Sequence, residues 1–401
     1  MKRLNKILSM ILVLWMILII VPTTYAEVTD SEIKPIVLEE NVEYQKLLSI
    51  GVFEENDSFE AVYVTRGEAV KYAVRACGYD VQAINTHSID VPFQDIKNNT
   101  HEVEILAAYQ LGIISGNTEF LPNGYIRLYE LSKILVNILG YGDVAKSKGG
   151  SLMDYYIIAE ELKLYKGCKF SGSNSNISIE TFLKIIFNTL NTKVLKLDYI
   201  GDSKDGSVYK RYRFNGNETL LNYAFDVYTV EGIVEANKYT SIYGKKGCTQ
   251  DMVTIGGYNF YVGNTNAGAF LGYYINGYYK YDDTADKSTF LYIEKDEKKN
   301  NITYVKAKDI ESDYVTSENF RYRIEENEME DVLIPKSATI IYNGGQVEVS
   351  KDYLCPTVGD VTLIDNNNDN RVDVVIVFNY RTVVAANVSA KNYTITDEIS
   401  R

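Results

Sequence analysis

The chain has 401 residues, of which 46% are hydrophobic and 24% charged, a globular balance that excludes a disordered or collagen-like protein. At this length we expect two or three domains. Acidic residues outnumber basic ones 54 to 41, and this excess of negative charge argues against binding to nucleic acid or to anionic membrane surfaces.

The first 26 residues have the pattern of a signal peptide. Lys2, Arg3 and Lys6 give a basic start, residues 7–21 form an almost wholly apolar run, and Ala26 is a small residue before the expected cleavage point. The apolar run is short for a membrane-spanning helix, so we favour cleavage over an uncleaved anchor. We therefore expect an exported protein with no membrane contact after cleavage.

Three segments between residues 36 and 196 follow one plan, at about 41–80, 93–142 and 152–195. Each contains a first, apolar helix that ends in a short turn. A polar loop and a second helix follow. The second helices carry apolar side chains three and four residues apart, which places these side chains on one face. A single unit is too small to bury that face, so we expect the three to share one core.

Short motifs in the first two copies carry a resemblance to a known family. They are Gly51–Phe53 and Val64–Glu68, then Phe93–Asp95, Leu111–Gly116, Phe120–Pro122 and Leu135–Tyr141. Through these motifs, residues 36–196 resemble the S-layer homology (SLH) family. In that family three repeats form a pseudo-threefold helical bundle that binds secondary cell-wall polysaccharide, commonly a pyruvylated glycan. The bundle anchors exported proteins noncovalently to walls of the Gram-positive, Firmicutes type.

The resemblance implies that Arg66, Asp95 and Arg127 bind the polysaccharide. Independently of the family, Thr65 and Glu68 are spaced as a capping box, which is a structural role. Arg66 is not needed for capping, and its planar fork of donors suits a carboxylate such as that of a pyruvyl ketal. The alternative is a surface arginine or an ion pair with a neighbouring acid.

The second and third copies depart from the motif of the first. Leu128 stands where the arginine is expected in the second copy, with Arg127 one place earlier, and Ile179 stands there in the third copy. Asp95 has a counterpart in neither of the other copies. We therefore expect at most one of the three binding grooves to be intact.

From about Leu197 the helical periodicity gives way to short alternating runs rich in Tyr, Val, Ile and Thr, which predict strands. Asn343–Gly344 between two such runs predicts a tight hairpin. We expect one or two small β-rich domains, at 197–310 and 311–401. The predicted fold class is therefore α+β and multidomain, with an all-α triple repeat followed by mostly-β domains.

An Asn/Asp-rich segment in the second half has the spacing of a calcium loop. Asp365, Asn367, Asp369 and Asp373 occupy positions 1, 3, 5 and 9 of that pattern. The glycine of position 6 and the acid of position 12 are missing, and strand residues follow, so an EF-hand is rejected. A calcium-binding turn between two strands and a β-turn whose side chains bond their own backbone remain the two interpretations. No other cofactor is expected.

The sequence contains no motif of a catalytic site. No HExxH, GxSxG or phosphate-loop pattern occurs, and the only two histidines, His87 and His101, both fall in the repeat half. We expect a non-enzymatic secreted protein on the cell wall, associated with the S-layer, anchored through polysaccharide and with a β-rich half that serves envelope structure or contacts other envelope proteins. One alternative is an exported scaffold with decayed repeats whose β-rich half binds glycan or calcium. A wall-acting glycosidase, which needs only two carboxylates, is the weakest alternative.

Overall fold

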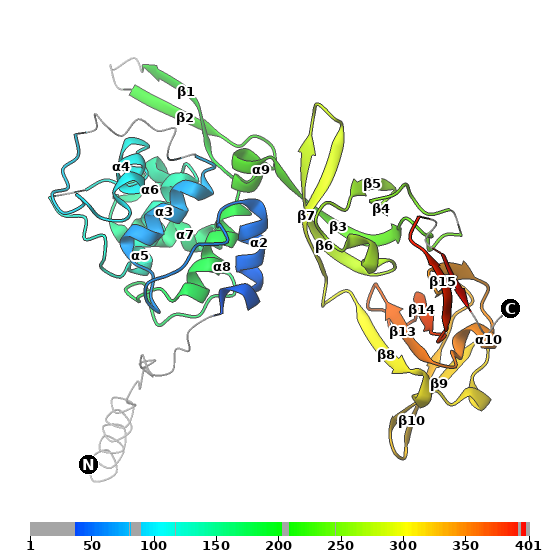
Figure 1. The fold of residues 1–401 in the computed structure, drawn as a ribbon. Helices are drawn as coiled ribbons and strands as arrows, with labels where there is room; N and C mark the ends of the chain where they lie inside the picture. The colour runs from blue at the N-terminus through cyan, green and yellow to red at the C-terminus, as the bar shows by residue number, and fades with distance from the viewer. Residues whose placement is uncertain are drawn as a thin grey trace, which may run out of the picture. The chain divides into compact units, whose positions relative to one another are not determined.

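The computed structural model describes residues 37–79, 81, 90–116, 118–202, 208–244, 246–391 and 394–397 (Figure 1). The predicted signal peptide and His87 lie outside these residues. The described chain is mixed α+β, as expected, and divides into a helical unit that ends at Leu220 and a strand-rich unit that begins at Leu221. Within the described ranges, no helix combines the length and apolar character that crossing a membrane requires.

The helical unit contains one helix pair in each expected repeat (Figure 1). The pairs are α2 (Val42–Ile50) with α3 (Arg66–Ala76), α4 (Glu102–Gln110) with α5 (Leu128–Ile138), and α7 (Leu152–Glu161) with α8 (Ile179–Leu190). A short 3-10 turn, η2 (Leu38–Glu40), precedes the first pair, and α6 (Gly142–Lys148) lies between the second and third pairs.

The three pairs close into a ring. Each second helix contacts the first helix of the next copy, α3 against α4, α5 against α7, and α8 back against α2. The segments before the second helices also pair with one another, through the bridges Tyr63–Ser178, Thr65–Tyr125 and Arg127–Asn176. Large side chains of all three copies are fully buried as a result, among them Phe53, Tyr72, Leu128, Leu135 and Phe182.

Local sequence signals set the ends of these helices. The Asn41 side chain accepts the Tyr44 N–H at 2.8 Å at the start of α2, and Ser151 and Ser178 cap α7 and α8. After α2 the chain turns at Gly51 with a φ of 95°, in the left-handed region that glycine adopts without a steric penalty.

A hairpin of β1 (Lys196–Asp202) and β2 (Val208–Arg213) belongs to the helical unit, although we expected residues from 197 onward in a β-rich domain. Its contacts explain the difference. Lys210 Nζ lies 2.6 Å from Asp143 Oδ2 on α6, and the Tyr212 hydroxyl donates to the same oxygen. These bonds hold the pKa of Asp143 well below its usual range, and burial together with Asp143 raises the pKa of Tyr212 to about 12.

Helix α9 (Leu220–Phe225) starts at the last residue of the helical unit, and the strand-rich unit continues from it into a closed barrel. The barrel order is β3-β4-β5-β7-β6, with β6 pairing back to β3. Its strands are β3 (Val227–Ala236), β4 (Met252–Ile255), β5 (Tyr258–Tyr261), β6 (Tyr274–Asp282) and β7 (Lys287–Lys295), with the turn η4 (Ala267–Phe270) between β5 and β6.

A five-stranded sheet of order β12-β11-β14-β13-β8 follows the barrel. Its strands are β8 (Asn301–Lys306), β11 (Thr339–Tyr342), β12 (Gly345–Val347), β13 (Gly359–Asp365) and β14 (Val374–Asn379). The other elements are η5 (Ala307–Asp309), η6 (Ser312–Tyr314), α10 (Lys351–Leu354), the hairpin of β9 (Asn319–Glu325) and β10 (Glu328–Leu333), and the hairpin of β15 (Ala385–Ser389) and β16 (Thr394–Asp397).

The barrel and this sheet share a core. Ile341, Ile364 and Val374 of the sheet belong to the same buried cluster as Val234 and Phe290 of the barrel. Because β8 pairs with β13, the sheet also crosses the domain boundary that we expected at 310/311. The two expected β-rich segments therefore form one unit with two adjoining cores.

The predicted hairpin at Asn343–Gly344 is present between β11 and β12. Both turn residues have positive φ, 46° and 83°, which is the conformation that a type I′ turn requires. Asparagine and glycine tolerate this conformation better than other residues do, so the local sequence accounts for the turn.

Candidate functional site

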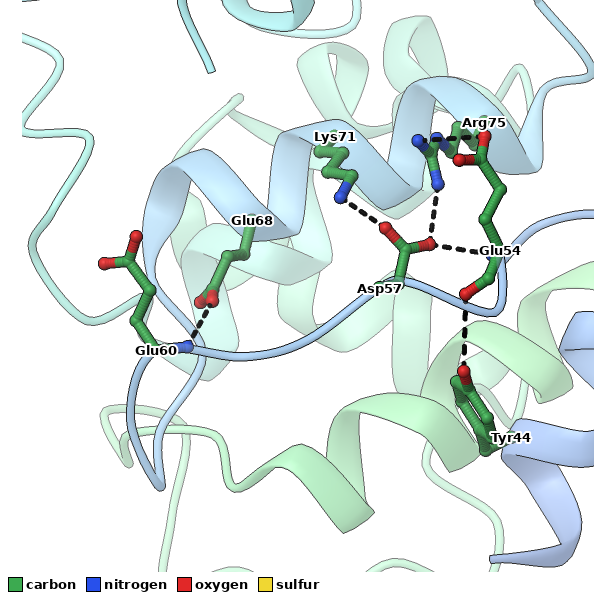
Figure 2. Close-up of polar contacts among 7 residues, drawn as sticks. All are labelled: Tyr44, Glu54, Asp57, Glu60, Glu68, Lys71 and Arg75. Carbon is green, nitrogen blue, oxygen red and sulfur yellow. Dashed lines mark hydrogen bonds and ion pairs between the residues drawn. The ribbon is translucent and has the colours of Figure 1, made fainter. Parts of the chain in front are cut away.

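The Thr65–Glu68 motif forms a capping box at the start of α3. Glu68 N donates to Thr65 Oγ1 at 3.2 Å, and Thr65 N donates to Glu68 Oε2 at 2.7 Å. The second Glu68 oxygen accepts the Glu60 N–H at 3.1 Å, so both oxygens of this almost fully buried side chain are bonded (Figure 2). Both residues therefore act on the backbone at the helix start.

Arg66 reaches from α3 to the second copy. Its Nε donates to the Phe120 carbonyl at 2.7 Å, and its guanidinium carbon lies 5.2 Å from the centre of the Phe120 ring. Its Nη1 forms an ion pair with Glu130 Oε1 on α5. Arg66 therefore forms the ion pair with a neighbouring acid that was one of the two interpretations of this residue. A quarter of its side chain remains exposed.

Asp95 bonds the loop around Phe120 that the Arg66 side chain contacts. Its two oxygens accept the N–H groups of Phe120 at 2.8 Å and Leu121 at 2.7 Å. Burial raises the pKa of Asp95, but these backbone bonds and the nearby Arg66 outweigh burial and leave the pKa below its usual value. The charged carboxylate therefore holds the loop in place.

Arg127 lies at the start of α5, where its backbone N–H donates to Glu130 Oε2 at 2.9 Å. Its side chain donates to the Asn174 carbonyl of the third copy at 3.1 Å. The side chain therefore points to a different loop from the one that Arg66 and Asp95 contact, and it does not line the groove described next. The structure brings Arg66 and Asp95 together but does not bring Arg127 to them.

A groove of about 370 Å³ opens beside Arg66. It is lined by Arg66 of the first copy, by Phe93, Ile113–Gly116, Glu119, Phe120, Ile126, Glu130, Lys133 and Ile134 of the second, and by Leu152 of the third. Phe93, Ile126 and Ile134 are buried and form an apolar floor, while Leu152 is 40% exposed at the rim. Polar groups of both signs stand over an apolar surface, an arrangement that suits a ligand with apolar faces and a charged substituent.

Lys133 is a cation of the groove that was not among the site residues expected from the sequence. Its Nζ donates to Ser115 Oγ at 2.9 Å and lies 5.9 Å from the centre of the Tyr155 ring. Burial lowers the pKa of Lys133, and Lys146 adds to this shift. Within the described part of the chain, Lys133 forms no ion pair with an acid. Aligning the three second helices by their first residue would have singled it out, since Lys71, Lys133 and Lys184 occupy the same position.

The same position in the first copy is neutralised (Figure 2). Lys71 Nζ lies 2.5 Å from Asp57 Oδ1, and Arg75 Nη1 lies 2.7 Å from Asp57 Oδ2. Arg75 also contacts Glu54 at 3.2 Å, and Tyr44 donates to the Glu54 carbonyl at 3.3 Å. The Asp57 side chain is only 5% exposed. Burial raises its pKa, but the bonds from Lys71 and the Glu54 backbone, together with the charges of Lys71 and Arg75, outweigh burial, so the pKa lies below its usual value.

In the third copy, Lys184 Nζ lies 3.3 Å from Glu43 Oε1. Lys71 and Lys184 therefore each have a carboxylate within ion-pair distance, and Lys133 has a hydroxyl instead. The counterparts of Arg66 differ as well. Leu128 and Ile179 are apolar and buried, so neither can bind an anionic substituent.

The Asn/Asp-rich segment forms the turn between β13 and β14. Asp365 Oδ1 accepts the Asn368 N–H at 2.6 Å, and Asp365 Oδ2 accepts the Asn370 N–H at 2.7 Å. Asp373 Oδ2 accepts the Asn366 N–H at 2.9 Å and the Asn367 side-chain amide at 3.2 Å. The side chains thus bond the loop itself, and burial, with Asp369 and Asp365 nearby, raises the pKa of Asp373. In the described ranges, no three His, Cys, Asp or Glu residues are grouped so that they could hold a metal ion.

Comparison with known proteins adds no further information about this site. No protein-family model matches the chain, and no curated protein is significantly similar to it.

Proposed function

We propose that this is an exported protein of the SLH type, anchored noncovalently to the cell wall through its helical unit. Its ligand is the secondary cell-wall polysaccharide, recognised through an anionic substituent such as a pyruvyl ketal. The observation that carries the proposal is the groove of the second copy, where Arg66 and Lys133 stand over an apolar floor. Sugar rings have apolar C–H faces that fit such a floor, and a cation in the groove favours the acid.

The anchor is expected to have one working groove. Leu128 and Ile179 replace the arginine in the other copies and are buried, and the lysines of those copies are paired with Asp57 and Glu43. A single groove has no avidity from neighbouring sites, so attachment depends on the affinity of this one groove. The strand-rich unit then serves envelope structure or contacts other envelope proteins.

A second candidate function places glycan binding in the strand-rich unit, with the repeats as a scaffold. A specific patch favours it. The Tyr380 hydroxyl lies 3.3 Å from Asp360 Oδ2, and the Phe378 ring is parallel to that of Tyr380 with centres 6.4 Å apart. Tyr304, on the neighbouring strand β8, interacts electrostatically with the same carboxylate. Tyr304 and Tyr380 are 59% and 57% exposed, so the rings are available for stacking with sugars.

Co-sedimentation of the mature protein with purified cell walls tests both candidates. If the groove is the anchor, pelleting requires the polysaccharide and is lost when the walls are stripped of it, while the double variant Tyr304→Ala, Tyr380→Ala pellets like the unchanged protein. Loss of pelleting in the tyrosine variant would transfer the function to the strand-rich unit. Pelleting that survives removal of the polysaccharide would contradict the SLH-type anchor.

A further inference from the structure

The three copies place a lysine at the same position and give it three different surroundings. Lys71 is 2.5 Å from Asp57, Lys184 is 3.3 Å from Glu43, and Lys133 donates to the hydroxyl of Ser115. Only Lys133 lies in the groove. The second copy therefore holds a half-buried cation that forms no ion pair with an acid in the described part of the chain.

The guanidinium of Arg66, the residue that the family motif singles out, already has partners within the protein. Its Nε is bonded to the Phe120 carbonyl and its Nη1 to Glu130. Glu130 in turn accepts the Arg127 N–H at the start of α5. A ligand acid that bound Arg66 would have to displace Glu130 from it. The Glu130 carboxylate would then lie next to the ligand acid, and the two negative charges would repel each other. The ion pair also cancels most of the attraction that Arg66 has for a second anion.

We propose that Lys133 and Ser115, rather than Arg66, hold the anionic substituent of the glycan, and that Arg66 is a positioning residue that fixes the Phe120 loop and Glu130. This inference rests on the proposed function and assigns the ligand acid to a particular pair of groups. The Ser115 hydroxyl is exposed and can turn to donate a second hydrogen bond to the acid.

The surroundings of Lys133 favour an anion there. A cation that is half-buried loses part of its hydration, and this loss disfavours the charged form, as the lowered pKa of Lys133 shows. A bound carboxylate would replace the lost hydration of Lys133 with a favourable charge–charge interaction. Since the floor of the groove is apolar, the charge pair forms in a medium that screens it less than water does.

The test is a binding titration of the full mature protein with purified pyruvylated polysaccharide and with the same polymer after removal of pyruvate. Lys133→Gln should weaken binding by about tenfold or more, the loss of one charge-assisted contact. Lys184→Gln is the matched control, at the same position in the third copy, and should bind within about twofold of the unchanged protein. Lys133→Arg keeps the charge and should retain most of the affinity.

Arg66→Gln separates a positioning role from a direct one. It should lower the melting temperature and weaken binding while leaving the salt dependence of the remaining affinity unchanged. Lys133→Gln should flatten that salt dependence, because one ion pair with the ligand is gone. Ser115→Ala tests the same contact at an exposed site outside the helices, in case Lys133→Gln lowers stability, and should weaken binding about threefold.

Two results would overturn the inference. One is equal affinity of Lys133→Gln and Lys184→Gln with Ser115→Ala unchanged, and the other is a flattened salt dependence in Arg66→Gln and not in Lys133→Gln. Failure of the unchanged protein to bind pyruvylated polymer better than the treated polymer is a different result, because it removes the proposed function itself.

Discussion

The first and second copies of the helical repeat differ most in what surrounds one lysine. In the first copy, the loop after α2 supplies Asp57, whose buried carboxylate bonds Lys71 and Arg75 and joins that loop to α3 (Figure 2). In the second copy, the turn after α4 supplies Ser115, and Lys133 faces an open groove. The comparison shows that an acid in the loop makes the lysine part of the scaffold, whereas without that acid the lysine bonds a hydroxyl and lines a groove.

The largest effect is expected when the closed copy is broken. Asp57→Ala leaves Lys71 and Arg75, which are 16% and 21% exposed, without their shared carboxylate. Removing one partner of a largely buried charge cluster should cost about 3 kcal/mol of unfolding free energy, measured by chemical denaturation. Ser115→Ala is the control in the open copy and should change stability by less than about 0.5 kcal/mol. Equal effects of the two would mean that the copies do not differ as described.

The open copy can be converted into a closed one. Ser115→Asp places a carboxylate where Lys133 already donates, so Lys133 becomes paired as Lys71 is. Polysaccharide affinity should fall about tenfold, or about 1.4 kcal/mol. Stability should rise by less than about 1 kcal/mol, because the new pair is partly exposed. Titration with the glycan measures the first effect and thermal unfolding the second; unchanged affinity would contradict the role of Lys133.

The capping residues give a smaller comparison. Thr65→Ala removes one half of the capping box of α3 and should cost about 1 kcal/mol, and Ser178→Ala should cost less, since that cap has no reciprocal acid. Urea denaturation at neutral pH measures both. A larger loss for Ser178→Ala would show that the box adds nothing to the single cap.

The smallest effect is the pH dependence that Asp57 of the first copy contributes to stability. The pKa of Asp57 is lowered in the folded protein, so its contribution is complete above the unfolded carboxyl pKa of about 4. The contribution is lost as the pH falls through the lower, folded pKa. The destabilisation by Asp57→Asn should therefore be larger at pH 6 than near pH 2.5, whereas that of Ser115→Ala should not depend on pH. Denaturation curves of both variants and of the unchanged protein at pH 6 and near pH 2.5 measure this difference. An equal loss of stability by Asp57→Asn at both pH values would contradict it.

Several features followed from the sequence because they depend on near neighbours in the chain. The box of Thr65 and Glu68, the turn at Asn343–Gly344 and the three helix pairs all rest on contacts within a few residues or on helical spacing. The α+β class followed from the change of periodicity near Leu197.

The domain limits differed because they depend on pairing between distant strands. The hairpin of β1 and β2 joins the helical unit through Asp143, and β8 joins the later sheet through β13. Alternation of polar and apolar residues predicts a strand, but it does not specify the partner with which that strand pairs.

The sequence by itself thus determined the three helix pairs, the capping box of Thr65 and Glu68 and, in the candidate groove, Arg66. Only the tertiary structure decided which charges meet. Arg66 and Glu130 are 64 residues apart, and Lys71 and Asp57 are 14 apart across a loop. For a given set of charges, the strength of an electrostatic interaction is set by distance and burial in the folded state. Three lysines at one position of a repeat therefore acquired two roles, two as paired cations of the scaffold and one as the candidate contact for a ligand.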